Sequence, residues 1–140
     1  MNIYIASPLF YEWQKAEVRR VADWLKNDYF KGFSNINVYC PQDFQVKNAW
    51  EKSNLNWARE VFAEDFKHLE YAHLVVCLSY GHQSDDGAAW EVGYAQAKNK
   101  KVWLIAQDEH VPYSLMFLDA NKLFRGTDLK EIEFSDVEWK

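Results

Sequence analysis

Two kinds of apolar run alternate along this chain, and that alternation limits the folds open to it. The strand-like runs are short and rich in β-branched and aromatic residues, and they lie at 2–6, 36–40, 73–79 and 101–106. The helix-like runs are longer, with apolar residues near helical spacing, and they lie at 12–27, 53–72 and 87–99. A repeated strand-helix order predicts a parallel sheet with helices on both faces.

The length of 140 residues suits one α/β domain with one core, spanning residues 1–140. Residues 114–121 predict a short helix and 122–124 a short fifth strand, whereas the acidic tail beyond them is weakly patterned. We therefore expect a doubly wound sheet, flavodoxin-like or Rossmann-like, of about five mainly parallel strands. Such sheets bind ligands beyond the carboxyl ends of their strands, which directs attention to the segments that follow residues 6, 40, 79 and 106.

Composition narrows the classes of partner. A net charge of -5 does not suggest a surface that binds nucleic acid or anionic membranes. No apolar run approaches the ~20 residues of a membrane span, and the opening stretch MNIYIASPLF lacks the features of a secretion signal. Cys40 and Cys77 lie in apolar runs and are expected to be buried thiols. These features predict a cytoplasmic protein.

Two carboxylates stand among apolar residues of predicted helices. Asp65 comes three residues after Phe62 and four before Leu69, on the apolar stripe of the 53–72 helix. Glu91, counted from Gly87, falls in the first turn of an apolar helix, where the helix dipole favours its ionised form. Each has an ordinary alternative: Asp65 at the edge of the stripe paired with a lysine or a backbone amide, and Glu91 as a common first-turn residue.

Asp85 and Asp86 lie in the loop after the third strand, at the expected binding crevice. Asp86 is the better candidate for the helix cap. Asp85, six residues before Glu91, can point into the same pocket from the other side. Converging carboxylates could bind a metal or could act as acid and nucleophile at a glycosidic bond. A magnesium site is the weaker choice because no phosphate-cradling glycine loop is present.

Other catalytic chemistries find little support. Ser7 and Ser79 lack the GxSxG context of a serine nucleophile. The histidines show no metal-ligand spacing and are expected to be structural or surface residues; they are His68, His73, His82 and His110.

The stretch DDGAAWEVGYAQAKNKKV (85–102) resembles the signature of the nucleoside 2-deoxyribosyltransferase family, D-x-G-[TA]-A-[FW]-E-x-G-[YA]-A followed by K-x-V. IYIASPLF (3–10) is similar to the opening strand and loop of the same family. The resemblance spans residue 3 to about residue 116. It implies an enzyme without a cofactor or a metal that acts on 2′-deoxynucleosides and free nucleobases.

The resemblance also implies a mechanism. Glu91 matches the family's nucleophile, which attacks C1′ and forms a deoxyribosyl ester that a second base then displaces, with overall retention. Asp65 and Asp85 match the acids on the base side. One of them must give a proton to the departing ring nitrogen, so its pKa should be raised by burial and by the other carboxylates. Tyr4 matches a strand tyrosine that orients the nucleophile.

The remaining matches concern substrate binding. Phe10 and Trp57 match the walls of the base pocket, and Gln45 matches a base-reading amide, which offers both a donor and an acceptor. The resemblance also implies a homo-oligomer in which the segment after the fourth strand completes a neighbour's sugar site. Together the implied substrate-binding residues are Ser7, Phe10, Gln45, Trp57, Gly87, Ser114 and Met116.

The chain departs from the family pattern at three places. Ser114 stands where an asparagine is common, and its hydroxyl has a shorter reach toward a sugar. The chain ends in Trp139 and Lys140, whereas some members end in a tyrosine that completes the partner's site. His73 replaces a common aspartate at the start of the third strand, a position expected to be structural.

Two other functions stay open at this point. A hydrolase of (deoxy)nucleoside 5′-monophosphates would use the same fold and the same glutamate. It would need hydrogen-bond donors around the 5′-phosphate, and the loop after the first strand offers Ser7 only. The carboxylate of Asp85 would also repel a phosphate. A non-catalytic nucleotide-binding domain would not need Glu91. The sequence leaves open which bases are accepted and the ratio of transfer to hydrolysis.

Overall fold

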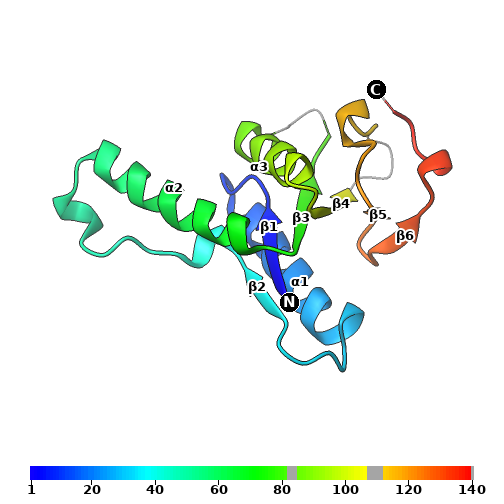
Figure 1. Cartoon of the computed structure of the whole chain (residues 1–140), viewed down its shortest axis with the longest axis horizontal. Coiled ribbons are helices and arrows are strands. Elements are labelled where there is room, and N and C mark those ends of the chain that lie inside the picture. Colours follow the sequence, from blue (N-terminus) through cyan, green and yellow to red (C-terminus); the bar gives the residue numbers. More distant parts are fainter. Residues whose placement is uncertain (82–84, 107–111, 140) are drawn as a thin grey trace.

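The computed structural model describes residues 1–81, 85–106 and 112–139, which form one α/β fold around a six-stranded sheet (Figure 1). The strand order is β2-β1-β3-β4-β5-β6. In chain order the strands are β1 (Asn2–Ala6), β2 (Asn37–Tyr39), β3 (Leu74–Ser79), β4 (Lys101–Ala106), β5 (Lys122–Arg125) and β6 (Lys130–Ile132). The predicted α/β class is confirmed.

The first five strands run parallel, and β6 pairs antiparallel with β5 at one edge of the sheet. The sequence predicted about five strands and missed the sixth. β6 is three residues long and its side chains are mostly exposed, so it carries no readable alternation.

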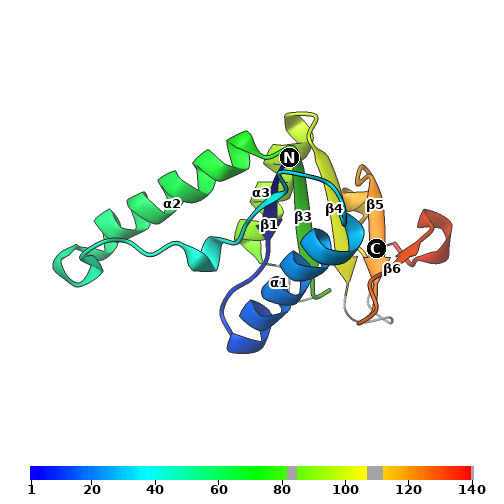
Figure 2. The ribbon, with the colours of Figure 1, turned by 90° about the horizontal axis from the view of Figure 1, so that it is seen from below.

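Helices cover both faces of the sheet. α1 (Glu12–Trp24), which continues as a π-helical turn at Leu25–Tyr29, packs on one face. α2 (Asn54–Tyr71) and α3 (Asp86–Ala97) pack on the other. Figure 2 shows α1 in front of the strands and α3 behind them. The short helix predicted at 114–121 is a 3₁₀ turn, Leu115–Phe117.

Alternate residues of the central strands fill two cores. On β1, Ile3 and Ile5 face α1, whereas Tyr4 and Ala6 face α3. Nearly every side chain of β3 is buried, as its continuous apolar run predicted. Both cysteines are buried free thiols, which confirms that expectation.

α2 projects beyond the sheet, and its far end stands away from the strands (Figures 1 and 2). Its N-cap residue, Ser53, accepts a hydrogen bond from Asn56 N at 3.3 Å through its hydroxyl oxygen. Leu69 is its one fully buried residue, and Phe62 is 58% exposed. The prediction of an inward stripe along the whole helix was therefore wrong for its first half. None of the helices described here is both long and apolar enough to cross a membrane.

Candidate active site

Tyr4 connects the centre of the sheet to α3. Its side chain on β1 is fully buried, and its hydroxyl donates a 2.6 Å hydrogen bond to Glu91 Oε1. Burial and the neighbouring carboxylate raise the pKa of Tyr4 well above its usual value, so it remains a hydrogen-bond donor. Glu91 therefore points toward the sheet and is held there by a rigid partner.

Glu91 lies in the second turn of α3, not the first, because the helix begins one residue earlier than the sequence indicated. Asp85, not Asp86, is the cap: its Oδ2 accepts from Ala88 N at 2.8 Å, and Glu91 is the sixth residue after it. The helix dipole acts mainly on the first turn, so it does not keep Glu91 ionised. Burial instead raises the pKa of Glu91 to about 7, although the hydrogen bond from Tyr4 acts in the opposite direction.

Asp65 has a tyrosine partner of its own. The hydroxyl of Tyr39, on β2, donates a 2.7 Å hydrogen bond to Asp65 Oδ1. Burial raises the pKa of Asp65, and this hydrogen bond partly offsets the rise. Tyr39 stands directly opposite Tyr4 in the register of the two strands, and the rings stack at 5.6 Å. Two paired tyrosines thus support one carboxylate from each helix.

The two carboxylates share a cleft between α2 and α3. Its volume is about 330 Å³. It is lined by Phe62, Asp65, Phe66, Leu69, Gly87, Trp90 and Glu91. Two acids in a small cleft with three aromatic walls can serve as nucleophile and proton donor toward a ligand with a flat apolar ring.

Asp85 borders a different and larger cavity. This cavity, about 610 Å³, lies on the opposite face of α3, against the end of β3 and the 112–117 segment. Ser114 and Met116 also line it, whereas Asp65 and Glu91 do not. The charge of Asp85 still contributes to the raised pKa of Glu91, so the two groups interact across the start of α3.

The sequence profile of the nucleoside 2-deoxyribosyltransferase family matches residues 3–134. The chain belongs to this family. A solved 2-deoxyribosyltransferase from the psychrotolerant bacterium Bacillus psychrosaccharolyticus is similar over 99% of this chain and 98% of its own, with 25% identity and a TM-score of 0.76. The chain is therefore an enzyme, and its sheet and helices follow the 2-deoxyribosyltransferase fold.

Two further structures resemble it. A conserved protein from Enterococcus faecalis V583 shares 25% identity at a TM-score of 0.56, over 78% of this chain and 65% of that one. A 2-desoxiribosyltransferase from Leishmania mexicana covers 99% of this chain and 82% of its own, also with a TM-score of 0.56; at 17% identity it shows the fold alone. A search of curated proteins finds no significant match.

Three residues that the resemblance assigned to the base pocket of this deoxyribosyltransferase lie outside both cavities. Phe10 is 76% exposed in the loop after β1, and Trp57 is 42% exposed on the projecting part of α2. Gln45 is exposed in the loop after β2, where its Nε2 lies 3.5 Å from Gln42 O. These side chains come from three different elements: the loop after β1, the loop after β2 and α2.

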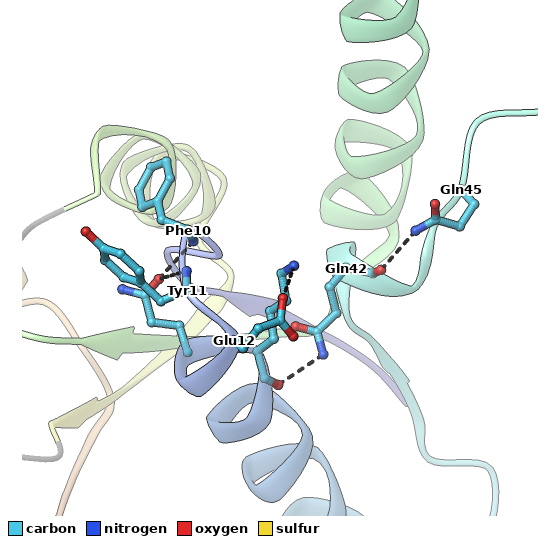
Figure 3. A network of polar contacts seen from close by, with 7 residues as sticks. Phe10, Tyr11, Glu12, Gln42 and Gln45 are labelled. Atoms are coloured by element: carbon cyan, nitrogen blue, oxygen red, sulfur yellow. Dashed lines mark hydrogen bonds and ion pairs between the residues drawn. The ribbon is translucent and has the colours of Figure 1, made fainter. Parts of the chain in front are cut away.

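Gln14 and Gln42 fix the two loops that carry Phe10 and Gln45. Gln14 Oε1 accepts hydrogen bonds from the backbone amides of Phe10 and Tyr11 at 2.9 and 3.1 Å. Gln42 Nε2 donates to Lys15 O at 3.1 Å, which ties the loop after β2 to α1 (Figure 3). Ser7 is turned inward, and its hydroxyl donates to Pro8 O at 3.0 Å.

Tyr39 and His68, which the sequence did not assign to the site, form contacts next to Asp65. The His68 ring stacks on Tyr39 at 3.8 Å, and its Nε2 lies 3.0 Å from Glu64 Oε1. His73, by contrast, accepts from Asn2 N at 2.9 Å in a structural contact. His82, His110 and Lys140 lie outside the described residues. Among the residues that are described, no three His, Cys, Asp or Glu side chains gather as a metal site would require.

Proposed function

We propose that this chain moves a 2-deoxyribosyl group from one nucleobase to another by double displacement at Glu91. The observation that carries the proposal is the 2.6 Å bond from Tyr4 to Glu91 Oε1 in a cleft that Glu91 shares with Asp65. Membership in the nucleoside 2-deoxyribosyltransferase family supports the reaction class. The Bacillus psychrosaccharolyticus relative, itself a 2-deoxyribosyltransferase, supports it further.

In the first half-reaction Glu91 acts as the nucleophile. Its Oε1 is engaged by Tyr4, which leaves Oε2 to attack C1′ of the deoxyribose. The C1′–N bond breaks, its electron pair leaves with the base, and a deoxyribosyl ester forms on Glu91. In the second half-reaction another base attacks C1′ from the opposite face and the carboxylate departs, so the configuration is retained overall.

The departing base needs a proton, and Asp65 is the better placed of the two candidate acids. Asp65 lines the same cleft as Glu91, and burial raises its pKa, which favours the protonated form. Asp85 borders the other cavity, and one of its oxygens already caps α3. We assign Asp85 an electrostatic role at Glu91 and at the sugar side.

Substrate binding draws on the exposed residues around the cleft. Phe10, Trp57 and Gln45 would enclose the base, and Ser114 with Met116 would reach the sugar site of a neighbouring subunit in a homo-oligomer. Their exposure in the single chain supports this arrangement, because apolar side chains such as Trp57 and Met116 gain by burial at an interface. The enzyme would act in the cytoplasm in the salvage of deoxyribonucleosides.

The test is base exchange. The protein is incubated with deoxyuridine or deoxyinosine plus adenine, and deoxyadenosine is followed by chromatography. Glu91→Ala and Glu91→Gln should abolish exchange in a folded protein, and Glu133→Gln, an exposed carboxylate elsewhere, should not. A deoxyribosyl adduct trapped on the wild-type protein should map to residue 91 by peptide mass spectrometry.

Parallel substrates separate the alternatives. Cleavage of deoxynucleoside monophosphates without exchange would replace the transferase with a hydrolase. Binding of nucleotides without any turnover would indicate a non-catalytic domain. An adduct at a residue other than Glu91 would overturn the mechanism.

A further inference from the structure

Tyr39 is held more firmly than its place on an edge strand suggests. Its ring stacks against Tyr4 on the neighbouring strand at 5.6 Å and against His68 of α2 at 3.8 Å, with the His68 ring nearly parallel. His68 is fixed in turn by Glu64 on the same helix. The Tyr39 hydroxyl therefore has a set position, and it points at Asp65 Oδ1, 2.7 Å away.

We propose that Tyr39 is a positioning residue that gives the two oxygens of Asp65 different tasks. The inference rests on the proposed function. Oδ1 accepts the hydroxyl of Tyr39, so the proton of a neutral Asp65 resides on Oδ2. Oδ2 is then the oxygen that delivers the proton to the departing base.

The proton balance of the reaction follows. As the C1′–N bond breaks, the Oδ2 proton moves to the ring nitrogen of the leaving base, and Asp65 becomes a carboxylate. The hydrogen bond from Tyr39 stabilises that new charge. In the second half-reaction Oδ2 takes a proton back from the incoming base, which restores the neutral acid.

Several charged or titratable groups face Asp65, and they act in different directions. Tyr39 from β2 and His68 from α2 lower the pKa of Asp65, whereas burial and Glu64 raise it. From β1 and α3, the charge of Asp65 raises the pKa of both Tyr4 and Glu91. The pKa of Tyr39 itself is raised by burial and by its bond to Asp65, so it remains a donor.

The test is Tyr39→Phe, which keeps the stacked ring and removes the hydroxyl alone. We expect kcat for base exchange to fall about tenfold to a hundredfold, the range for losing a hydrogen bond to a charged group, with KM changed less than twofold. Without the hydroxyl the pKa of Asp65 rises, so the alkaline limb of the kcat profile moves to higher pH. Tyr71→Phe, an exposed tyrosine on α2, should change neither quantity.

A double variant keeps the inference falsifiable if Tyr39→Phe lowers stability. Because Tyr39 acts through Asp65, Asp65→Asn with Tyr39→Phe should have the same kcat as Asp65→Asn alone. Additive losses, or an unmoved alkaline limb, would overturn the inference while wild-type exchange leaves the proposed function standing. If the wild-type protein exchanges no bases, the proposed function fails instead.

Discussion

Tyr4 and Glu91 are 87 positions apart in the chain, yet the Tyr4 hydroxyl lies 2.6 Å from Glu91 Oε1. The contact joins the middle of β1 to the second turn of α3, so the packing of a helix on a sheet decides where the carboxylate points. Tyr4 donates to the charged form of Glu91, and burial opposes that form. The balance places the pKa of Glu91 at about 7.

Tyr4→Phe should therefore shift the pH dependence of catalysis. The nucleophile must be ionised, so kcat/KM of the wild-type enzyme should rise with pH through about 7. Without the hydroxyl the pKa of Glu91 rises, and this acid limb should move to higher pH, with the largest loss below pH 7. Exchange rates of both proteins, measured between pH 5 and 9, test this prediction. If the acid limb of kcat/KM stays in place, Tyr4 does not set the pKa of Glu91.

Glu91→Gln should make the protein more stable at alkaline pH while it abolishes exchange. The pKa of Glu91 is raised in the folded protein from 4.5 to about 7, so the stability it provides is complete below pH 4.5 and is lost as the pH rises through 7. When the pH rises from 5 to 8.5, the free energy of unfolding of the wild-type protein should fall by about 2 to 3 kcal/mol relative to that of the variant. Urea unfolding at both pH values measures the difference, and an equal gap at the two would contradict it.

Two substitutions separate the capping role of Asp85 from its electrostatic role at Glu91. Asp85→Ala removes the acceptor for Ala88 N and should cost about 1 kcal/mol of unfolding free energy. Asp85→Asn keeps an acceptor and should cost much less, yet it removes the charge near Glu91. If Asp85 acts electrostatically, both variants should lower the pKa of Glu91, so the acid limb of kcat/KM should move to lower pH. If it is only a cap, Asp85→Asn should behave as wild type.

Gly87→Ala tests how tightly the start of α3 is built. A Cβ at position 87 would lie 3.2 Å from Asp85 Oδ2, so the carboxylate must shift by a few tenths of an ångström. Alanine otherwise favours a helix by up to about 1 kcal/mol over glycine. We expect a folded protein with reduced exchange, and Gly93→Ala, where no atom lies within 4 Å, is the matched control. Equal activity in the two variants would show that the position of the Asp85 carboxylate next to residue 87 does not affect catalysis.

The sequence located Asp65 and Glu91 because a carboxylate among apolar helical neighbours is conspicuous. It could not locate Tyr39, since the residue that stands opposite Tyr4 depends on the register of two strands, and local spacing does not encode register. The choice of Asp86 as cap failed because two adjacent aspartates offer the same chemistry. The prediction that the apolar stripe of α2 is buried failed for another reason. Periodicity identifies an apolar face of a helix, but it does not show whether another element covers that face.

The projection of α2 has a mechanical consequence. The helix is anchored to the core near Leu69, and Asp65 is four residues from that pivot, about 6 Å, whereas Trp57 is twelve residues away, about 18 Å. A small tilt about the pivot therefore displaces Trp57 about three times as far as Asp65. We expect α2 to behave as a lever whose tip adjusts to heterocycles of different size while Asp65 moves about a third as far as Trp57.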